Sequence, residues 1–341
     1  MQLLQLGEHT WVIQGGANIG VIAYDGRCLI IDSGMDKDVG RDILNQVKKL
    51  GLTPTALLVT HAHADHFGGA HYLVRQTGLH VYATRVEAAV MSGPILEPLY
   101  LFSGAQPPRE LQHKFLLAKP CLADSILQGN EQTVDHIPLQ VILLPGHSTE
   151  QVGVAFGDTF FVGDAFLTPD ILDKHRIPFY ADVQAGLLTL NTLKTRIAPF
   201  KHIVAGHGEI YTSVAGATHA IDYTVQRLET ILEYIRTALA DGEPRQASDI
   251  LSSVANAQGA TINVLSQYVL YNTTIQSALS TLYTRGEILP IFRDNHLVWC
   301  RSEKAWTVTL PSPGTLYALR RLSRYAHRYQ CSIAFLQPEL P

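Results

Sequence analysis

Cysteine, basic charge and long apolar runs are all scarce in this sequence. The 341 residues include four cysteines, none of them in a CxxC pair, so a reducing cytoplasm is expected rather than a disulfide framework. Charged residues make up 16% of the chain and the net charge is −4, which argues against a basic binding surface across the whole molecule. No apolar run reaches the roughly 18 residues of a membrane span, and residues 1–9 lack the features of a signal peptide. We therefore expect a cytoplasmic protein without membrane contact.

Apolar runs and helical patterns alternate along residues 1–240. Residues 1–24 alternate apolar and polar side chains around Gly15 and Gly16, which predicts two strands joined by a glycine turn. Residues 37–50 carry apolar side chains at helical spacing, and Gly51 follows as a stop signal. Further strands are expected at residues 27–31, 56–59, 80–83, 139–144, 151–156, 159–162 and 202–205, and further helices at residues 69–78, 183–197 and 217–240. This alternation predicts a layered α/β domain over residues 1–240.

Residues 92–125 break this alternation. They are apolar, rich in proline and without a regular period. We interpret them as an irregular insertion, which is either a lid over the functional site or a packed surface loop.

A second, smaller domain is expected over residues 241–341. The sequence Asp241-Gly-Glu-Pro244 marks its start, because glycine and proline end the preceding helical pattern. Helices are expected at residues 247–254 and from about Asn272, and a hairpin is expected at residues 288–292 and 296–300. This order predicts a winged-helix-like domain. Near its end lies a basic stripe, which is interpreted either as a solvated face or as a partner-binding face: Arg320, Arg321, Arg324 and Arg328.

Four apolar runs end in histidine or aspartate side chains. Strand ends converge on one rim of the sheets in a layered α/β fold, so these runs predict a cluster of His61, His63, Asp65, His66, His147, Asp164 and His207. A single histidine at a strand end is usually a hydrogen-bonded structural residue. Five imidazoles and two carboxylates suit two divalent ions that share a bridging ligand, with zinc preferred and iron or manganese as alternatives.

These residues resemble the ordered motifs of the metallo-β-lactamase superfamily. The resemblance rests on the motifs His61-Ala-His-Ala-Asp-His66, Pro145-Gly-His147, Gly163-Asp164 and Gly206-His207, and on Ile30-Ile-Asp32, which is similar to the first motif of that superfamily. It extends to about residue 235 and implies an αββα four-layer sandwich with the metals at one edge. The first ion would be held by His61, His63 and His147, and the second by Asp65, His66 and His207. Asp164 would bridge both ions, and Asp32 would orient a ligand histidine.

The resemblance also implies a hydrolase. Two ions that share a water lower its pKa from about 16 toward neutrality, and the resulting hydroxide attacks a carbonyl carbon or a phosphorus. Asp164 and Asp65 are the expected catalytic carboxylates, the second as a residue that orients the nucleophile. Ser148 does not lie in a Gly-x-Ser-x-Gly sequence, so we interpret it as structural. His66 is similar to the glyoxalase II and RNase Z branches and differs from common β-lactamases, so antibiotic hydrolysis is not expected.

The expected substrate is a small ester, thioester or lactone. An apolar insertion over the metals favours a small molecule over a polymer. A glutathione thioester is disfavoured, because the stretch from Asp164 to His175 lacks the glycine- and cysteine-rich sequence of glyoxalase II enzymes. Five residues of this region are expected either at the mouth of the pocket or in a solvated loop: Asp170, Asp173, Lys174, His175 and Tyr180.

Two alternative functions remain open. An RNA phosphodiesterase is suggested by Tyr223 and Arg227 on the helix after His207, together with the winged-helix-like segment. Against it, the outer face of the helix at residues 272–286 carries only one basic residue, Arg285, whereas phosphate binding requires several. The other alternative is a regulatory metal-binding protein with weak hydrolase activity. The sequence also leaves a homo-oligomer open.

Overall fold

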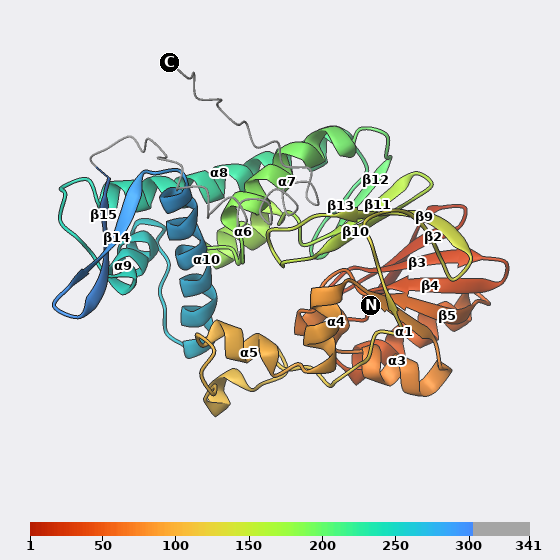
Figure 1. The fold of residues 1–341 in the computed structure, drawn as a ribbon. Helices are drawn as coiled ribbons and strands as arrows, with labels where there is room; N and C mark the ends of the chain where they lie inside the picture. Colours follow the sequence, from red (N-terminus) through yellow and green to blue (C-terminus); the bar gives the residue numbers. More distant parts are fainter. Residues whose placement is uncertain (303–341) are drawn as a thin grey trace, which may run out of the picture. The chain divides into compact units, whose positions relative to one another are not determined.

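Two large β-sheets, a two-stranded hairpin and the helices around them make up the part of the chain that the structure describes (Figure 1). The computed structural model describes residues 1–302, without the side chains of residues 130–132. The first sheet has seven strands in the order of the sequence: β1 (Gln2–Gly7), β2 (Thr10–Gln14), β3 (Ile19–Tyr24), β4 (Arg27–Ile31), β5 (Thr53–Leu58), β6 (His80–Ala83) and β7 (Ser125–Ile126). Strands β1 to β4 are antiparallel, and β4 to β7 are parallel.

The second sheet has six strands in the order β13-β12-β11-β10-β9-β8. Its strands are β8 (Asn130–Val134), β9 (Ile137–Leu143), β10 (Val152–Phe156), β11 (Thr159–Gly163), β12 (His202–Ala205) and β13 (Ile210–Tyr211). Only β11 and β12 pair in parallel, and the other neighbours are antiparallel.

Helices cover the outer face of each sheet. The first sheet is covered by α1 (Lys37–Lys49), α2 (Ala64–Phe67) and α3 (Ala70–Thr77), and α4 (Arg85–Ser92) follows β6. The second sheet is covered by α7 (Val183–Arg196) and α8 (Val214–Ala238), and α6 (Pro169–His175) contacts α8. No helix within residues 1–302 is long and apolar enough to cross a bilayer.

The side-chain alternation of the strands explains the four layers. In β3, Val21 packs toward the helices of the first sheet, whereas Ile22 packs toward the second sheet. In β4, Ile30 faces the helices and Leu29 faces the second sheet. Because both faces of these strands are buried, apolar side chains are needed at successive positions. The αββα sandwich expected from the sequence is therefore confirmed.

Residues after the expected boundary at 241 pack on the same core as the second sheet. Helices α9 (Ala247–Ala257) and α10 (Leu265–Thr284) share buried contacts with α7 and α8, and the hairpin of β14 (Ile288–Arg293) and β15 (His296–Arg301) follows. The hairpin lies where the sequence predicts it. A separate winged-helix-like domain stays a prediction. The basic stripe at Arg320, Arg321, Arg324 and Arg328 lies outside the described residues.

Three local expectations were wrong in detail. Residues 1–24 form three strands rather than two, because a turn at Glu8 and His9 divides the first of them. Helix α10 begins at Leu265 rather than near Asn272, and its N-cap residue Val264 provides no side-chain hydrogen bond as a start signal. The insertion at residues 92–125 is not wholly irregular, since it contains α5 (Leu96–Leu101) and the 3₁₀ turn η1 (Arg109–Leu111).

Candidate metal centre

The seven predicted ligands follow strand ends at one edge of the two sheets. The segment after β5 carries His61, His63, Asp65 and His66, and the last two lie in helix α2. The segments after β9, β11 and β12 carry His147, Asp164 and His207 respectively. Gly163 supports the turn at Asp164 with a left-handed backbone, at a φ of 53° that glycine adopts without strain. The structure brings all seven side chains together in three overlapping groups of neighbouring ligand atoms.

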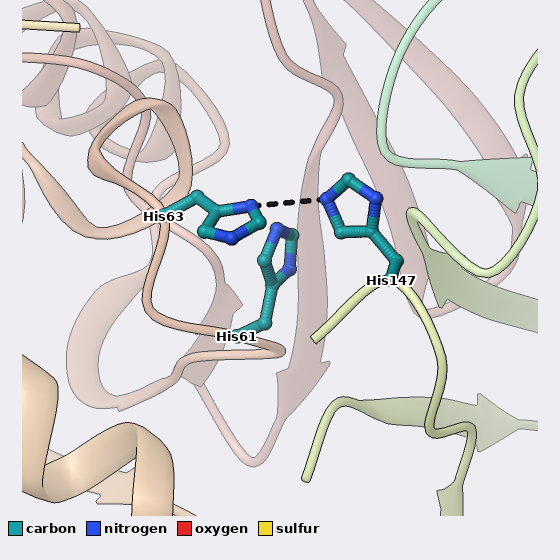
Figure 2. A group of neighbouring side chains, drawn as sticks. All are labelled: His61, His63 and His147. Carbon is teal, nitrogen blue, oxygen red and sulfur yellow. Dashed lines mark hydrogen bonds between the residues drawn. The ribbon is translucent and has the colours of Figure 1, made fainter. Parts of the chain in front are cut away.

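The first group consists of His61, His63 and His147 (Figure 2). The Nε2 atom of His147 lies 3.0 Å from Nδ1 of His63. The ring of His61 lies edge-on to both, with its centroid 4.6 Å from that of His63 and 5.1 Å from that of His147. Two nitrogens bound to one tetrahedral zinc ion at the usual bond length would be about 3.3 Å apart. The three imidazoles are therefore spaced as ligands of one ion.

The second group consists of Asp65, His66 and His207. Nε2 of His207 lies 3.1 Å from Nε2 of His66 and 3.3 Å from Oδ2 of Asp65. Asp164 lies between the two groups, since its Oδ2 is 3.4 Å from Nε2 of both His147 and His207. Asp164 forms the third group together with His61 and His66, and it lies close to a histidine of each of the other two groups, as the resemblance implies for a bridging ligand.

Four of the five imidazoles have their Nδ1 atom fixed by an oxygen atom. Nδ1 of His66 faces Asp32 Oδ2 at 2.8 Å, and Nδ1 of His61 faces Thr60 Oγ1 at 3.0 Å. The backbone carbonyls of Phe179 and Gly16 do the same for His147 at 2.9 Å and for His207 at 2.6 Å. A protonated Nδ1 that donates to these oxygens leaves the lone pair on Nε2, which points into the cluster. The surrounding chain therefore holds these imidazoles in the tautomer that binds a metal.

Asp32 organises the strand end that carries the first histidines. It has a left-handed backbone with a φ of 63°, a conformation that aspartate tolerates better than most residues. Its carboxylate accepts hydrogen bonds from the backbone N and the hydroxyl of Thr60, at 2.8 and 2.9 Å, besides its contact with His66. The expected contact between Asp32 and a ligand histidine is thus present.

Unsatisfied atoms show that the cluster fits a bound cation. Nε2 of His61 and Oδ1 of Asp164 are buried and have no hydrogen-bond partner among the described residues. A Cβ atom at Gly206 would lie 2.0 Å from Oδ1 of Asp164, so only glycine leaves room for that carboxylate. Buried acceptor atoms without a donor are costly unless a cation occupies the space between them.

The pKa values of the histidines are lowered in the first ligand group and raised in the second. Burial lowers the pKa of His63 to about 3 and also lowers the pKa of His61 and His147, so these imidazoles are neutral and ready to bind a metal. Burial also acts to lower the pKa of His66, but the carboxylates of Asp164 and Asp32 outweigh it and raise this pKa to about 10. A cation entering the second group would therefore displace a proton.

Several residues near the cluster carry no signal in the sequence. Phe179 places its ring 5.2 Å from His63 and 5.5 Å from His147, between ring centroids. Glu87 of helix α4 is buried, and its carboxylate accepts hydrogen bonds from the loop that carries His61 and His63 and from the loop that carries His147. These residues lie far from the motifs along the chain, so only the packing of the loops reveals them.

Two of the five residues expected at the mouth of the pocket have structural partners. Tyr180 is fully buried, and its hydroxyl donates to the carbonyl of Ala165 at 2.9 Å. Asp173 accepts hydrogen bonds from Tyr223 and Arg227, which hold helix α6 against α8. The contacts of Tyr223 and Arg227 within residues 1–302 are therefore those of a helix–helix junction.

Comparison with known proteins agrees with this geometry. A family model described as "Metallo-beta-lactamase superfamily" matches residues 12–207. The "Probable metallo-hydrolase YqgX" of Bacillus subtilis is 29% identical over 203 residues, which cover 56% of this chain and 85% of that protein. A "Hydroxyacylglutathione hydrolase" of Vibrio campbellii is 27% identical over 161 residues, and the chain spans 48% of its length.

Similarity to solved structures concerns the fold. The structure of a β-lactamase domain protein from Burkholderia ambifaria has a TM-score of 0.66 at 18% sequence identity, and the match covers 88% of this chain and 93% of that one. The matched family segment, residues 12–207, contains all seven clustered side chains. The chain therefore belongs to the metallo-β-lactamase superfamily and is a metal-dependent hydrolase with histidine and aspartate clusters suited to divalent metal ions.

Proposed function

We propose that this protein is a dinuclear hydrolase of a small ester, thioester or lactone. The observation that carries the proposal is Asp164, whose carboxylate lies between two complete three-residue ligand groups. Two bound ions, zinc in this proposal with iron or manganese as alternatives, would lower the pKa of a water molecule to about 7 and polarise the substrate oxygen. No nucleophilic side chain is required from the protein.

The chain's own residues orient the reactants. Asp65 is the more open of the two carboxylates, with 34% of its side chain exposed against 6% for Asp164. Asp65 can therefore accept a hydrogen bond from the attacking water and direct it toward the substrate. Phe179 forms an apolar wall against His63 and His147, which excludes bulk water from that side.

An acyl substrate is supported by the surroundings of the site. Among the described residues, Asp65 and Asp164 form their ion pairs with histidines and with no lysine or arginine, whereas binding a nucleic-acid backbone depends on basic side chains that neutralise its phosphates. Phe179 also packs against an apolar cluster formed by the insertion and helix α10. The relative named as a hydroxyacylglutathione hydrolase is consistent with acyl chemistry.

The substrate class is tested by one side-by-side assay. Purified wild-type protein and Asp164→Ala are compared on panels of acyl thioesters, esters and lactones and on labelled single-stranded RNA, with the metal content of each measured. We expect turnover of an acyl substrate by the wild type, about two ions per chain, and loss of turnover in the variant. RNA cleavage that exceeds every acyl activity and is lost in Asp164→Ala would replace the proposal with a phosphodiesterase. A metal-loaded protein inert on every substrate would favour the regulatory alternative.

A further inference from the structure

Glu87 is a buried carboxylate outside the ligand motifs. It lies in the first turn of helix α4, and its side chain is 2% exposed. The carboxylate accepts three hydrogen bonds: its Oε2 from the backbone N of Ala62 at 2.8 Å, and its Oε1 from the hydroxyl of Ser148 at 2.6 Å and from the backbone N of Glu150 at 3.1 Å. All three partners are donors, so they match the ionised form of Glu87.

These three donors belong to two loops that carry ligands. Ala62 separates His61 from His63, and Ser148 directly follows His147. Each histidine of the first ligand group is therefore adjacent in sequence to a residue that hydrogen-bonds to Glu87. The residues on either side of His207 in the second group have no hydrogen bond to Glu87.

The loop after His147 also forms hydrogen bonds with the start of helix α4, the helix that carries Glu87. The hydroxyl of Thr84 donates to the carbonyl of Glu150 at 2.9 Å, and the backbone N of Val86 donates to the carboxylate of Glu150 at 2.9 Å. Glu150 thereby caps the start of α4, where the backbone N–H groups have no partner within the helix. The start of α4 and the loop after His147 are thus joined by hydrogen bonds in both directions.

We propose that Glu87 is a positioning residue that sets the distance between the His61–His63 loop and the His147 loop. The first ligand group consists of side chains from these two loops alone, so its affinity for an ion depends on their relative placement. This inference rests on the proposed dinuclear site. Glu87 acts through the ligands and does not contact the reacting atoms.

Replacing Glu87 with glutamine tests its hydrogen bonding while leaving the packing of its side chain nearly unchanged. Glutamine has nearly the same shape, but one of its two terminal groups is an NH₂ that donates instead of accepting. In either orientation this NH₂ faces a backbone N–H, of Ala62 or of Glu150. One buried donor is then unpaired and the two loops lose their common acceptor.

The experiment is a zinc titration of metal-free protein against a chromophoric chelator. Wild type, Glu87→Gln and Glu150→Gln are compared, together with the thermal unfolding of each metal-free protein. We expect Glu87→Gln to bind one of the two zinc equivalents about 10- to 100-fold more weakly and the other unchanged. Glu150→Gln is the matched control, because its amide oxygen still accepts from Val86 and its backbone still donates to Glu87. Its two affinities should equal those of the wild type.

The outcomes separate this inference from the proposed function. A wild type that binds no zinc overturns the dinuclear proposal itself. A wild type that binds two equivalents, with Glu87→Gln binding both equally well, overturns the role of Glu87. Equal weakening of zinc binding at both equivalents, with lowered thermal stability of the metal-free variant, also overturns the role of Glu87, because it shows a general structural role.

If Glu87→Gln does not fold, Ser148→Ala removes one of the three donors and should weaken zinc binding at the same single equivalent by a smaller factor. Unchanged affinities in Ser148→Ala would overturn the role.

Discussion

At the level of single residues, two buried glutamates near the metal centre differ in their hydrogen bonding. The Glu87 carboxylate accepts three hydrogen bonds, whereas the carboxylate of Glu97 in α5 forms none with the described residues, although Glu97 is only 4% exposed. Burial raises the pKa of Glu97 well above its usual value, and the nearby carboxylates of Asp65 and Glu87 raise it further. The neutral form of Glu97 is therefore favoured in the folded protein, and its ionisation opposes folding.

We predict that Glu97→Gln stabilises the protein at alkaline pH. The pKa of Glu97 is higher in the folded protein than its ordinary value of 4.5 in the unfolded chain, so wild-type stability decreases as the pH rises above 4.5. Glutamine cannot ionise. Urea denaturation should show the variant more stable by on the order of 1–3 kcal/mol at about pH 8, with a smaller difference at about pH 5. A variant that is less stable than the wild type at about pH 8 would contradict this assignment.

At the level of elements, the insertion at residues 92–125 is attached to helix α10. Leu101, Leu111 and Leu116 of the insertion form a buried cluster with Val269. Phe179 packs against this cluster and also lies beside His63 and His147. The insertion is thus linked through one aromatic ring to the first ligand group, which supports the prediction that it shapes access to the metals.

Leu111→Ala should loosen the insertion without unfolding the sandwich. Removing a fully buried leucine side chain costs about 2–5 kcal/mol, and here the loss falls on the contact between the insertion and α10. Hydrogen exchange should increase within residues 96–116 and remain unchanged in β3 and β4, and the KM for the acyl substrate should rise several-fold through the altered Phe179.

Leu122→Ala is the control for this experiment. Leu122 lies in the same insertion but is 72% exposed, so its truncation should change neither exchange nor KM. An unchanged KM in Leu111→Ala, despite faster exchange in the insertion, would show that the insertion is a packed surface loop rather than a lid.

At the level of the whole molecule, the metal centre joins the two halves of the sandwich. Three of the ligand-bearing segments follow strands of the second sheet, and the fourth follows β5 of the first sheet. Both ligand groups combine residues from the two sheets, as with His61 and His147 in one and His66 and His207 in the other. Ions bound to these groups would therefore connect the two sheets at this edge.

Removal of the metals should lower the thermal stability of the entire fold. Each ion present at about 100 times its dissociation constant adds about 2.7 kcal/mol to the folded state, which corresponds to a shift of roughly 4 °C per ion in a protein of this size. Differential scanning calorimetry with and without EDTA should show this decrease, and added zinc should reverse it. A melting temperature unaffected by EDTA, after metal loss has been verified, would argue against ions that link the two sheets.

The sequence determined the cluster of metal-ligand residues and the layered α/β character of this protein, and the family resemblance that rests on those residues implied the order of the layers. The spacing from His61 to His66 is local and specific to metal ligation, so it could be recognised without a structure. Short apolar runs also predicted buried strands, as with residues 56–59, which overlap strand β5 at Thr53–Leu58. Helix boundaries without a local sequence signal were predicted wrongly, as at the start of α10, where Val264 offers no capping side chain.

Only the tertiary structure decided how the ligands are held. Glu87 lies 25 residues from Ala62 and 61 from Ser148 along the chain, and their hydrogen bonds exist because β6, α4 and two loops pack together at one sheet edge. The carbonyl of Phe179, which orients His147 from 32 residues away, depends in the same way on the path of its loop. Such contacts follow from the packing of distant segments, and no spacing within a single segment encodes them.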